Sequence, residues 1–171
     1  MPYPEALVHP MREELTRLGV AELRDMTAVD EAFEAAESET TLLIVNSVCG
    51  CAAANARPAV AMAMQTEVQP DRYVTVFAGQ DLEATARARE YMRGIAPSSP
   101  FMALLKEGDP VFVLERRHIE GRSANAIAMD LVNAYQKFCG TDATAENGPE
   151  RPAYDQSPIG NGLPNTFRSI K

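Results

Sequence analysis

Two cysteines separated by a single glycine, Cys49-Gly50-Cys51, carry the clearest chemical potential in this sequence. They follow the mostly apolar residues 41–48, which predict a buried strand, and they precede an alanine-rich segment that predicts a helix. A helix N-terminus has unpaired N–H groups and the positive end of the helix dipole, and both favour a thiolate over a thiol. The spacing therefore predicts a redox-active thiol site at a strand-to-helix turn.

Acidifying Cys49 would favour its departure from a mixed disulfide at least as much as its attack. A thiol with a pKa of about 8.5 is about 3% ionised at pH 7, and a pKa of about 7 raises the thiolate about 16-fold. Intrinsic nucleophilicity falls about 5-fold over the same change, so attack gains only about 3-fold. The helix dipole contributes ~0.3–1 kcal/mol, so N–H groups near Gly50 and Cys51 must add to it. Gly50 is expected to let the loop turn sharply and a large thiol adduct approach.

The three cysteines do not predict a disulfide framework, because their number is odd and residues 1–5 show no export signal. A cytoplasmic protein is expected. A Cys49–Cys51 disulfide would close a small, strained ring, which favours a monothiol route through Cys49. A zinc site usually needs four ligands, and only His118 and Cys139 stand out as additions to the pair. No bound cofactor or metal is expected, and a non-catalytic metal-binding module is the weaker hypothesis.

Composition narrows the class of partner. The formal charge of −8 argues against broad binding to nucleic-acid phosphates. No stretch approaches the roughly 20 apolar residues of a membrane span, so neither nucleic acid nor membrane is an expected partner. Residues 1–140 are predicted to form one domain. Residues 141–171 are polar and proline-rich, which predicts a flexible C-terminal tail or one draped over the surface.

Strands and helices alternate along the predicted domain. Strands are predicted at residues 41–48, 72–78, 101–106 and 111–116, the last two as a hairpin. A first helical turn is predicted at Pro4-Glu5, with an interruption or a kink at Pro10 and a clear helix at residues 11–18. The other predicted helices begin with Thr27 as N-cap, span 52–65 with a kink at Pro58, run from Asp81 as N-cap to about 93, and run from Ser123 as N-cap to Cys139. This order predicts an α/β fold with a mixed four-stranded sheet, helices on both faces and extra N-terminal helices.

Two features resemble the thioredoxin fold: a dithiol that opens a kinked helix, and the Ser99-Pro100 step before a short strand. More closely, the chain resembles the bacilliredoxin family of Cys-Gly-Cys thioredoxin-like proteins over roughly residues 3–139. The matching segments are PMR at 10–12, VNSVCGCAA at 45–53, ARPA at 56–59, TVFAGQD at 75–81, APSSP at 96–100 and MALLK at 102–106.

The resemblance implies a thiol–disulfide oxidoreductase that removes bacillithiol from S-bacillithiolated proteins. Cys49 is then the attacking thiol that forms the mixed disulfide, Cys51 is the resolving partner that the family offers, and Cys139 is an accessory or a spare thiol. The family's cis-proline assigns Ser99 and Pro100, together with Gly50, to substrate binding. Bacillithiol would be the thiol co-substrate. The partners would be S-thiolated client proteins, a low-molecular-weight thiol and a recycling disulfide reductase.

Three points stay open at this stage. A general protein disulfide isomerase or reductase using Cys49 and Cys51 is the second enzymatic hypothesis. Arg57 is interpreted either as a solvated helix residue or as a substrate-binding cation for an anionic thiol. The strand before the dithiol has no buried acid, where thioredoxins carry an aspartate, so no residue is assigned to handle the proton.

Overall fold

Strand β2 (Thr41–Asn46) is buried at every residue, and the other elements are arranged around it. The computed structural model describes residues 1–140, so the prediction of a flexible tail at 141–171 lies outside the described residues. The helices are α1 (Glu5–Thr16), α2 (Met26–Ala35), the π-helical η1 (Ala52–Ala56), α3 (Arg57–Ala63), α4 (Leu82–Tyr91), α5 (Arg116–Ile119) and α6 (Ala124–Cys139). The other strands are β1 (Ala21–Glu22), β3 (Arg72–Phe77), β4 (Phe101–Lys106) and β5 (Asp109–Leu114).

The described strands form one mixed sheet in the order β1-β3-β2-β4-β5. Strand β3 runs parallel to β1 and β2, whereas β4 runs antiparallel to both β2 and β5. The predicted mixed α/β sheet is therefore confirmed, but the prediction of four strands is wrong because the sheet has five. The missed strand, β1, is two residues long, and the pairing continues only as far as the N–H of Leu23, which donates to the Thr75 carbonyl at 2.8 Å. Such a short strand shows no alternating pattern.

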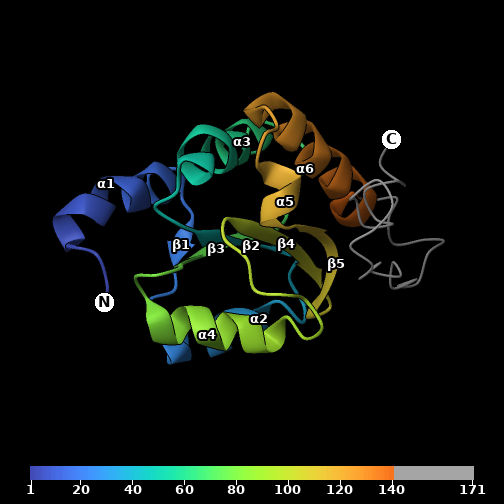
Figure 1. Ribbon diagram of the computed structural model, residues 1–171. Helices are drawn as coiled ribbons and strands as arrows, with labels where there is room; N and C mark the ends of the chain where they lie inside the picture. The colour runs from blue at the N-terminus through green and yellow to red at the C-terminus, as the bar shows by residue number, and fades with distance from the viewer. Residues whose placement is uncertain (141–171) are drawn as a thin grey trace.

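Helices cover both faces of the sheet, as predicted (Figure 1). Leu42 and Ile44 point to the face covered by α3 and α6, whereas Leu43 and Val45 point to the face covered by α2 and α4. A strand that is covered on both faces has apolar residues on both, which explains why residues 41–48 show no polar alternation. The expected N-terminal helices α1 and α2 both precede β2.

The helix after the dithiol is not a simple kinked α-helix. Its first turn widens into η1, and the regular helix α3 begins at Arg57. Pro58 has no N–H to donate to the carbonyl of Ala54, four residues earlier, so the missing bond falls where the turn is wide. The predicted irregularity is present, and it takes the form of a π-helical segment before Pro58.

Helix α1 runs through Pro10 without interruption, so an interruption there, one of the two predicted effects of this residue, is wrong. Pro10 and Ala6 are both exposed, so water can satisfy the carbonyl that lacks a helical partner. Buried Arg12 holds α1 in place. Its guanidinium donates to Asp81 at 2.7 and 2.9 Å and to Glu22 at 2.8 Å.

The predicted helix caps were correct only in part. The N-cap of α2 is Asp25 and not Thr27, because the Asp25 carboxylate accepts a hydrogen bond from the N–H of Ala28 at 2.8 Å. Asp81 precedes α4 as predicted, but it makes no side-chain cap bond, since its carboxylate is bound to Arg12. Asp81 therefore occupies the N-cap position of α4 without capping the helix with its side chain.

The C-terminal part of the domain contains a confirmed helix and a missed one. Ser123 caps α6 by accepting the N–H of Ala126 at 3.2 Å, and Ile127 and Leu131 bury its predicted apolar stripe. The last strand ends at Leu114. The residues that were predicted to extend it begin the four-residue helix α5.

Candidate active site

The dithiol loop and the Ser99-Pro100 step lie at the same end of the central strands. Strand β2 ends at Asn46 and β4 begins at Phe101. Because these strands are antiparallel, with Val45 opposite Phe101, the end of one lies beside the start of the other. The Ser99-Pro100 peptide bond is cis, which confirms the expectation drawn from the resemblance. The fold therefore brings together two segments that are 50 residues apart in the chain.

Four donors surround the sulfur of Cys49. The hydroxyl of Ser47 donates to Sγ at 3.2 Å and the backbone N–H of Ala52 donates at 3.4 Å. The thiol and the backbone N–H of Cys51 supply the other two hydrogen bonds. Partial burial raises the pKa of Cys49, but the hydrogen bonds from Cys51, Ser47 and Ala52 outweigh it, and the pKa is lowered from its ordinary value. Cys49 is therefore the thiol of the pair that ionises first.

Cys51 has the opposite tendency. Its pKa is raised by burial first, and then by the hydrogen bond to Cys49 and the negative charge that develops there. The charge of Arg116 opposes this shift. When the pair loses its first proton, the negative charge therefore falls on Cys49 and Cys51 keeps its proton.

Gly50 is not required for a sharp turn. It begins the helix with a φ outside the left-handed region, and a Cβ added there would meet no other atom within 4 Å. The predicted role in turning the loop is therefore wrong. Gly50 is exposed and its surroundings are open, and the approach of a large adduct there stays a prediction.

Arg57 is buried, with only 3% of its surface exposed, so it is not a solvated helix residue. Its Nε and Nη2 donate to the Glu14 carboxylate at 2.6 and 3.3 Å, and Nη1 donates to Asn46 Oδ1 at 3.1 Å and to the Ser47 carbonyl at 3.2 Å. All three guanidinium nitrogens thus bind protein acceptors. Arg57 therefore has no free guanidinium nitrogen for the substrate binding that was predicted. It supports the site instead, because it holds the loop that carries Ser47.

Helix α5 forms a further wall of the site. The N–H of Arg116 donates to the Ser98 hydroxyl at 3.3 Å, which joins α5 to the cis-proline loop. The Asn55 side chain donates to the Ile119 carbonyl at 3.2 Å, which joins α5 to the helix that follows the dithiol. One short helix therefore connects both predicted parts of the site.

Cys139 lies at the other end of the sheet. Lys106, at the end of β4, donates to the carbonyl of Phe138 at 3.1 Å, and Thr40, just before β2, hydrogen-bonds the Cys139 thiol. A strand advances about 3.3 Å per residue, so the length of β2 separates this thiol from Cys49 by roughly 20 Å. A disulfide needs Cα atoms within about 7 Å. Cys139 is therefore out of reach of Cys49 within one chain.

The two residues considered for a metal site do not form a ligand cluster with the dithiol. His118 is buried in α5, where its Nδ1 accepts the N–H of Glu115 at 3.0 Å, and Cys139 is at the far end of the sheet. Within residues 1–140, no group of three or more His, Cys, Asp or Glu side chains is arranged to hold a metal ion. In the same part of the chain, no helix is both long and apolar enough to cross a membrane.

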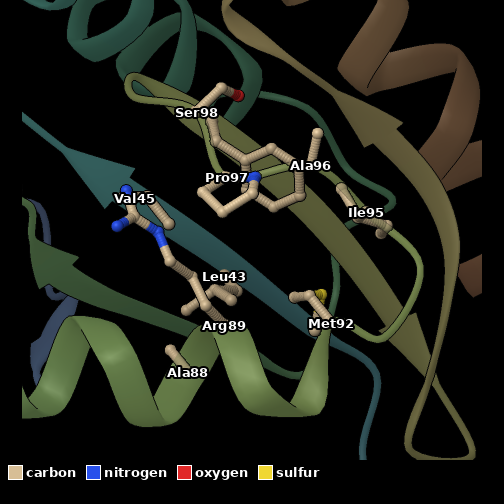
Figure 2. Close-up of a pocket in the computed structure, with 10 residues that line it drawn as sticks. Leu43, Val45, Ala88, Arg89, Met92, Ile95, Ala96, Pro97 and Ser98 are labelled. Atoms are coloured by element: carbon tan, nitrogen blue, oxygen red, sulfur yellow. The ribbon is translucent and has the colours of Figure 1, made fainter.

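A narrow crevice lies beside the cis-proline loop, on the α2 and α4 face of the sheet. Figure 2 shows Arg89 reaching from α4 across this crevice, which is also lined by Val45 and Pro97. Its volume of about 10 Å³ is room for about one water molecule. The crevice is therefore too small for a thiol adduct. Cys49 and Cys51 do not line it, and both are partly exposed.

Comparison with known proteins decides the family. The disulphide isomerase family matches the chain over residues 3–139. A bacilliredoxin of Salinibacter ruber is 61% identical over 171 residues, covering 99% of each chain. The chain belongs to the bacilliredoxin family. A member from Koribacter versatilis is 48% identical over 145 residues, covering 85% of this chain and 99% of the relative, and one from Bacillus licheniformis is 50% identical over 138 residues, covering 80% and 95%.

The bacilliredoxins differ in how far they match. The Salinibacter relative aligns along the residues after 140, whereas the Bacillus match spans 138 residues. The matched core in each case includes the length of chain that carries the dithiol, the cis-proline and α5. The family membership and the described geometry together assign a thiol–disulfide redox role to this protein.

Sequence reasoning missed two parts of the site. Ser47 stands two residues before Cys49, and a hydroxyl at that spacing in a tight loop was the available signal. Helix α5 is too short for a periodic pattern, and its signal was local: Glu115 and His118 form a reciprocal capping box around its first turn.

Proposed function

We propose that the protein removes bacillithiol from S-bacillithiolated proteins by attack of Cys49. The observation that carries the proposal is the set of hydrogen bonds from Ser47, Ala52 and Cys51 that lowers the pKa of Cys49, at the end of β2 that faces the cis-proline. The relatives bear the name bacilliredoxin. A thioredoxin-like fold is the architecture we propose for the domain, since the central mixed sheet, the helix after the dithiol and the cis-proline all fit it.

The proposed reaction is one thiol–disulfide exchange. The Cys49 thiolate attacks the bacillithiol sulfur of the mixed disulfide, a new Cys49–bacillithiol disulfide forms, and the client cysteine leaves as a thiolate that takes up a proton. The number of disulfides is unchanged. A low-molecular-weight thiol or a disulfide reductase of the cytoplasm then clears Cys49, since Cys139 lies too far away to do so.

The hydrogen-bond donors around Cys49 have two effects on this exchange. They stabilise the thiolate that attacks, and they stabilise the same thiolate when it must leave the Cys49–bacillithiol disulfide. Because nucleophilicity falls as the pKa falls, we expect the second effect to be the larger one. Cys51 keeps its proton during attack and can donate it to the departing client sulfur.

The test is adduct transfer. A single-cysteine client protein carrying bacillithiol is mixed with the full chain, and mass spectrometry follows loss of the adduct from the client and its gain on Cys49. We expect Cys49→Ala to abolish the gain and Cys139→Ala, the matched control, to leave it unchanged. Equal transfer to Cys49→Ala would show that Cys49 is not the nucleophile.

A second candidate is a general disulfide isomerase or reductase. It is favoured by the description of the matching family and by the direct hydrogen bond between Cys51 and Cys49. It predicts comparable turnover on scrambled protein disulfides without bacillithiol, together with a strong dependence on Cys51. In the bacillithiol mechanism, Cys51→Ala still accepts one adduct on Cys49.

A further inference from the structure

Arg116 is held next to the dithiol by contacts on both sides of its helix. Its own N–H donates to Ser98 in the cis-proline loop at 3.3 Å, and the carbonyl of Ile119, at the other end of α5, accepts from Asn55 at 3.2 Å. Asn55 follows Cys51 by one turn of helix. The cis-proline loop and the helix that follows the dithiol therefore both hold α5, and with it the Arg116 backbone, in place.

The Arg116 guanidinium is a cation within electrostatic reach of both sulfurs. Its pKa is raised by Glu120 first and then by the charges of Cys51 and Cys49, and its own charge lowers the pKa of Cys51. The side chain is 47% exposed. In a chain with a net charge of −8, this guanidinium places a positive charge close to the thiols.

The internal partner of Arg116 is weak enough to be exchanged. Its Nε donates to the Glu120 carboxylate at 3.3 Å, and the Glu120 side chain is 60% exposed. Exposed pairs spaced i,i+4 contribute little, because water competes for both charges. A carboxylate on a ligand at the dithiol can therefore replace or share the Glu120 contact at small cost.

We propose that Arg116 binds a carboxylate of the small thiol that is transferred to Cys49, and that it thereby selects anionic adducts over neutral and cationic ones. This inference rests on the proposed transfer function. An adduct on Cys49 has open space at Gly50, close to the start of α5 that carries Arg116. A planar guanidinium offers paired N–H donors that match a carboxylate, which a point charge does not.

The experiment uses three caps of similar size and different charge. One peptide with a single cysteine is prepared as its mixed disulfide with mercaptopropionate, with mercaptoethanol or with cysteamine. In each case the Cys49 thiolate attacks the sulfur of the cap, and the peptide leaves as a thiolate. The rate at which the cap appears on Cys49 of the full chain is measured by mass spectrometry, for the parent, Arg116→Gln and Arg117→Gln.

Arg117 provides the matched control, because it lies on the same helix and its guanidinium is bound to Glu115 at 2.6 Å. We expect Arg116→Gln to lower the ratio of mercaptopropionate to mercaptoethanol transfer about two- to fivefold, the size of effect of an exposed ion pair. We expect cysteamine transfer to rise relative to mercaptoethanol. The ratios in Arg117→Gln should equal those of the parent.

The ratio separates recognition from an effect on the thiols. If Arg116→Gln slows the transfer of all three caps by the same factor, Arg116 acts only by changing the ionisation of the two thiols. The inference is then wrong, while the proposed transfer function stands. If Arg117→Gln changes the ratios equally, general surface charge explains them and the inference is again wrong. If the parent accepts none of the three caps, the proposed transfer function itself fails.

Discussion

The two ends of the central sheet each carry a thiol, and the two thiols have opposite acidities. Cys49, beyond the last residue of β2, has a lowered pKa, whereas Cys139, beside the residue that precedes β2, has a pKa raised to about 11. Burial raises the pKa at both positions. At Cys49 the donors Ser47, Ala52 and Cys51 outweigh burial, whereas at Cys139 the hydrogen bond from Thr40 does not.

The difference shows what makes a thiol reactive in this fold. Both cysteines are partly exposed, so access alone does not separate them. The separating factor is the set of hydrogen-bond donors. Cys49 precedes a helix and accepts from its N–H groups as well as from the side chains of Ser47 and Cys51, whereas at Cys139, the last residue of α6, burial and the nearby charge of Asp71 prevail. The same residue type is thus activated at one terminus and suppressed at the other.

The largest effect is expected from replacing Arg57, which holds the loop before Cys49 in place. Arg57→Met should lower the free energy of unfolding by about 2–4 kcal/mol, because Asn46 Oδ1 and the Ser47 carbonyl each lose a buried donor. Glu14 is half exposed and can be hydrated instead. Denaturant unfolding measures the loss.

Arg12→Met is the matched control for that change, since Arg12 is equally buried and holds α1 without contacting the dithiol loop. It should destabilise the protein while leaving the reactivity of Cys49 unchanged in the folded fraction. Arg57→Met should reduce this reactivity as well. An Arg57→Met protein with the parent's stability and reactivity would refute the supporting role.

Alkylation at pH 7 tests whether Cys49 is more reactive than Cys139. A thiol of ordinary pKa is about 3% ionised there, whereas one with a pKa of about 11 is about 0.01% ionised. After the higher nucleophilicity of the more basic thiolate is allowed for, Cys49 should react with iodoacetamide more than about tenfold faster than Cys139. Peptide mapping after timed quenching gives both rates.

The pH dependence of these rates has a definite sign. A lowered pKa completes ionisation at lower pH, so the Cys49 rate should level off early, while the Cys139 rate should keep rising toward pH 11. In denaturant the two rates should converge. Equal rates in the folded protein would remove the contrast between the two ends of the sheet.

A smaller effect is expected from one donor at Cys49. Ser47→Ala removes the hydroxyl that donates to Sγ at 3.2 Å, so the pKa of Cys49 should rise. A net contribution of about 1 kcal/mol corresponds to about a fivefold loss of thiolate at pH 7. Thiolate absorbance followed against pH measures the change. Ser47→Thr, which keeps the hydroxyl, should restore most of it, and failure to do so would point to packing instead.

The smallest effect is expected at Gly50. Gly50→Ala meets no atom within 4 Å, so the stability of the fold should be unchanged or slightly increased by the better helix former. Transfer of a mercaptoethanol cap to Cys49 should stay within about twofold, and transfer of bacillithiol should slow more than that, because only a large adduct reaches the added methyl group. A lower melting temperature would instead indicate that the loop needs glycine.

The parts of this structure that the sequence predicted are those with a repeated or local signal. The apolar run at β2, the alternation along β3 and the capped stripe of α6 each specify an element over many residues. The cis-proline came from the family resemblance, since an isolated Ser-Pro step favours the trans bond. The position of the dithiol followed from its place between a strand and a helix.

The parts that were missed depend on contacts between distant residues or on elements too short for a pattern. Strand β1 and helix α5 have too few residues to show a period. Arg57 was interpreted either as a solvated helix residue or as a substrate-binding cation. Its burial depends on acceptors 10 to 43 residues away in the chain, which a local pattern does not show. The link between α5 and the dithiol likewise exists only in the folded chain.

The π-helical segment η1 sets the angular relation between the dithiol and Arg57. Each residue of an α-helix turns the chain by about 100°, so one residue more or fewer between Cys51 and Arg57 rotates one against the other by that angle. Deleting a single alanine from Ala52–Ala56 would restore a regular helix and swing the guanidinium away from Asn46 and Ser47. The wide turn therefore sets the rotation of the helix between these positions. It lets the helix have partly exposed thiols at its start and a buried Arg57 guanidinium further along.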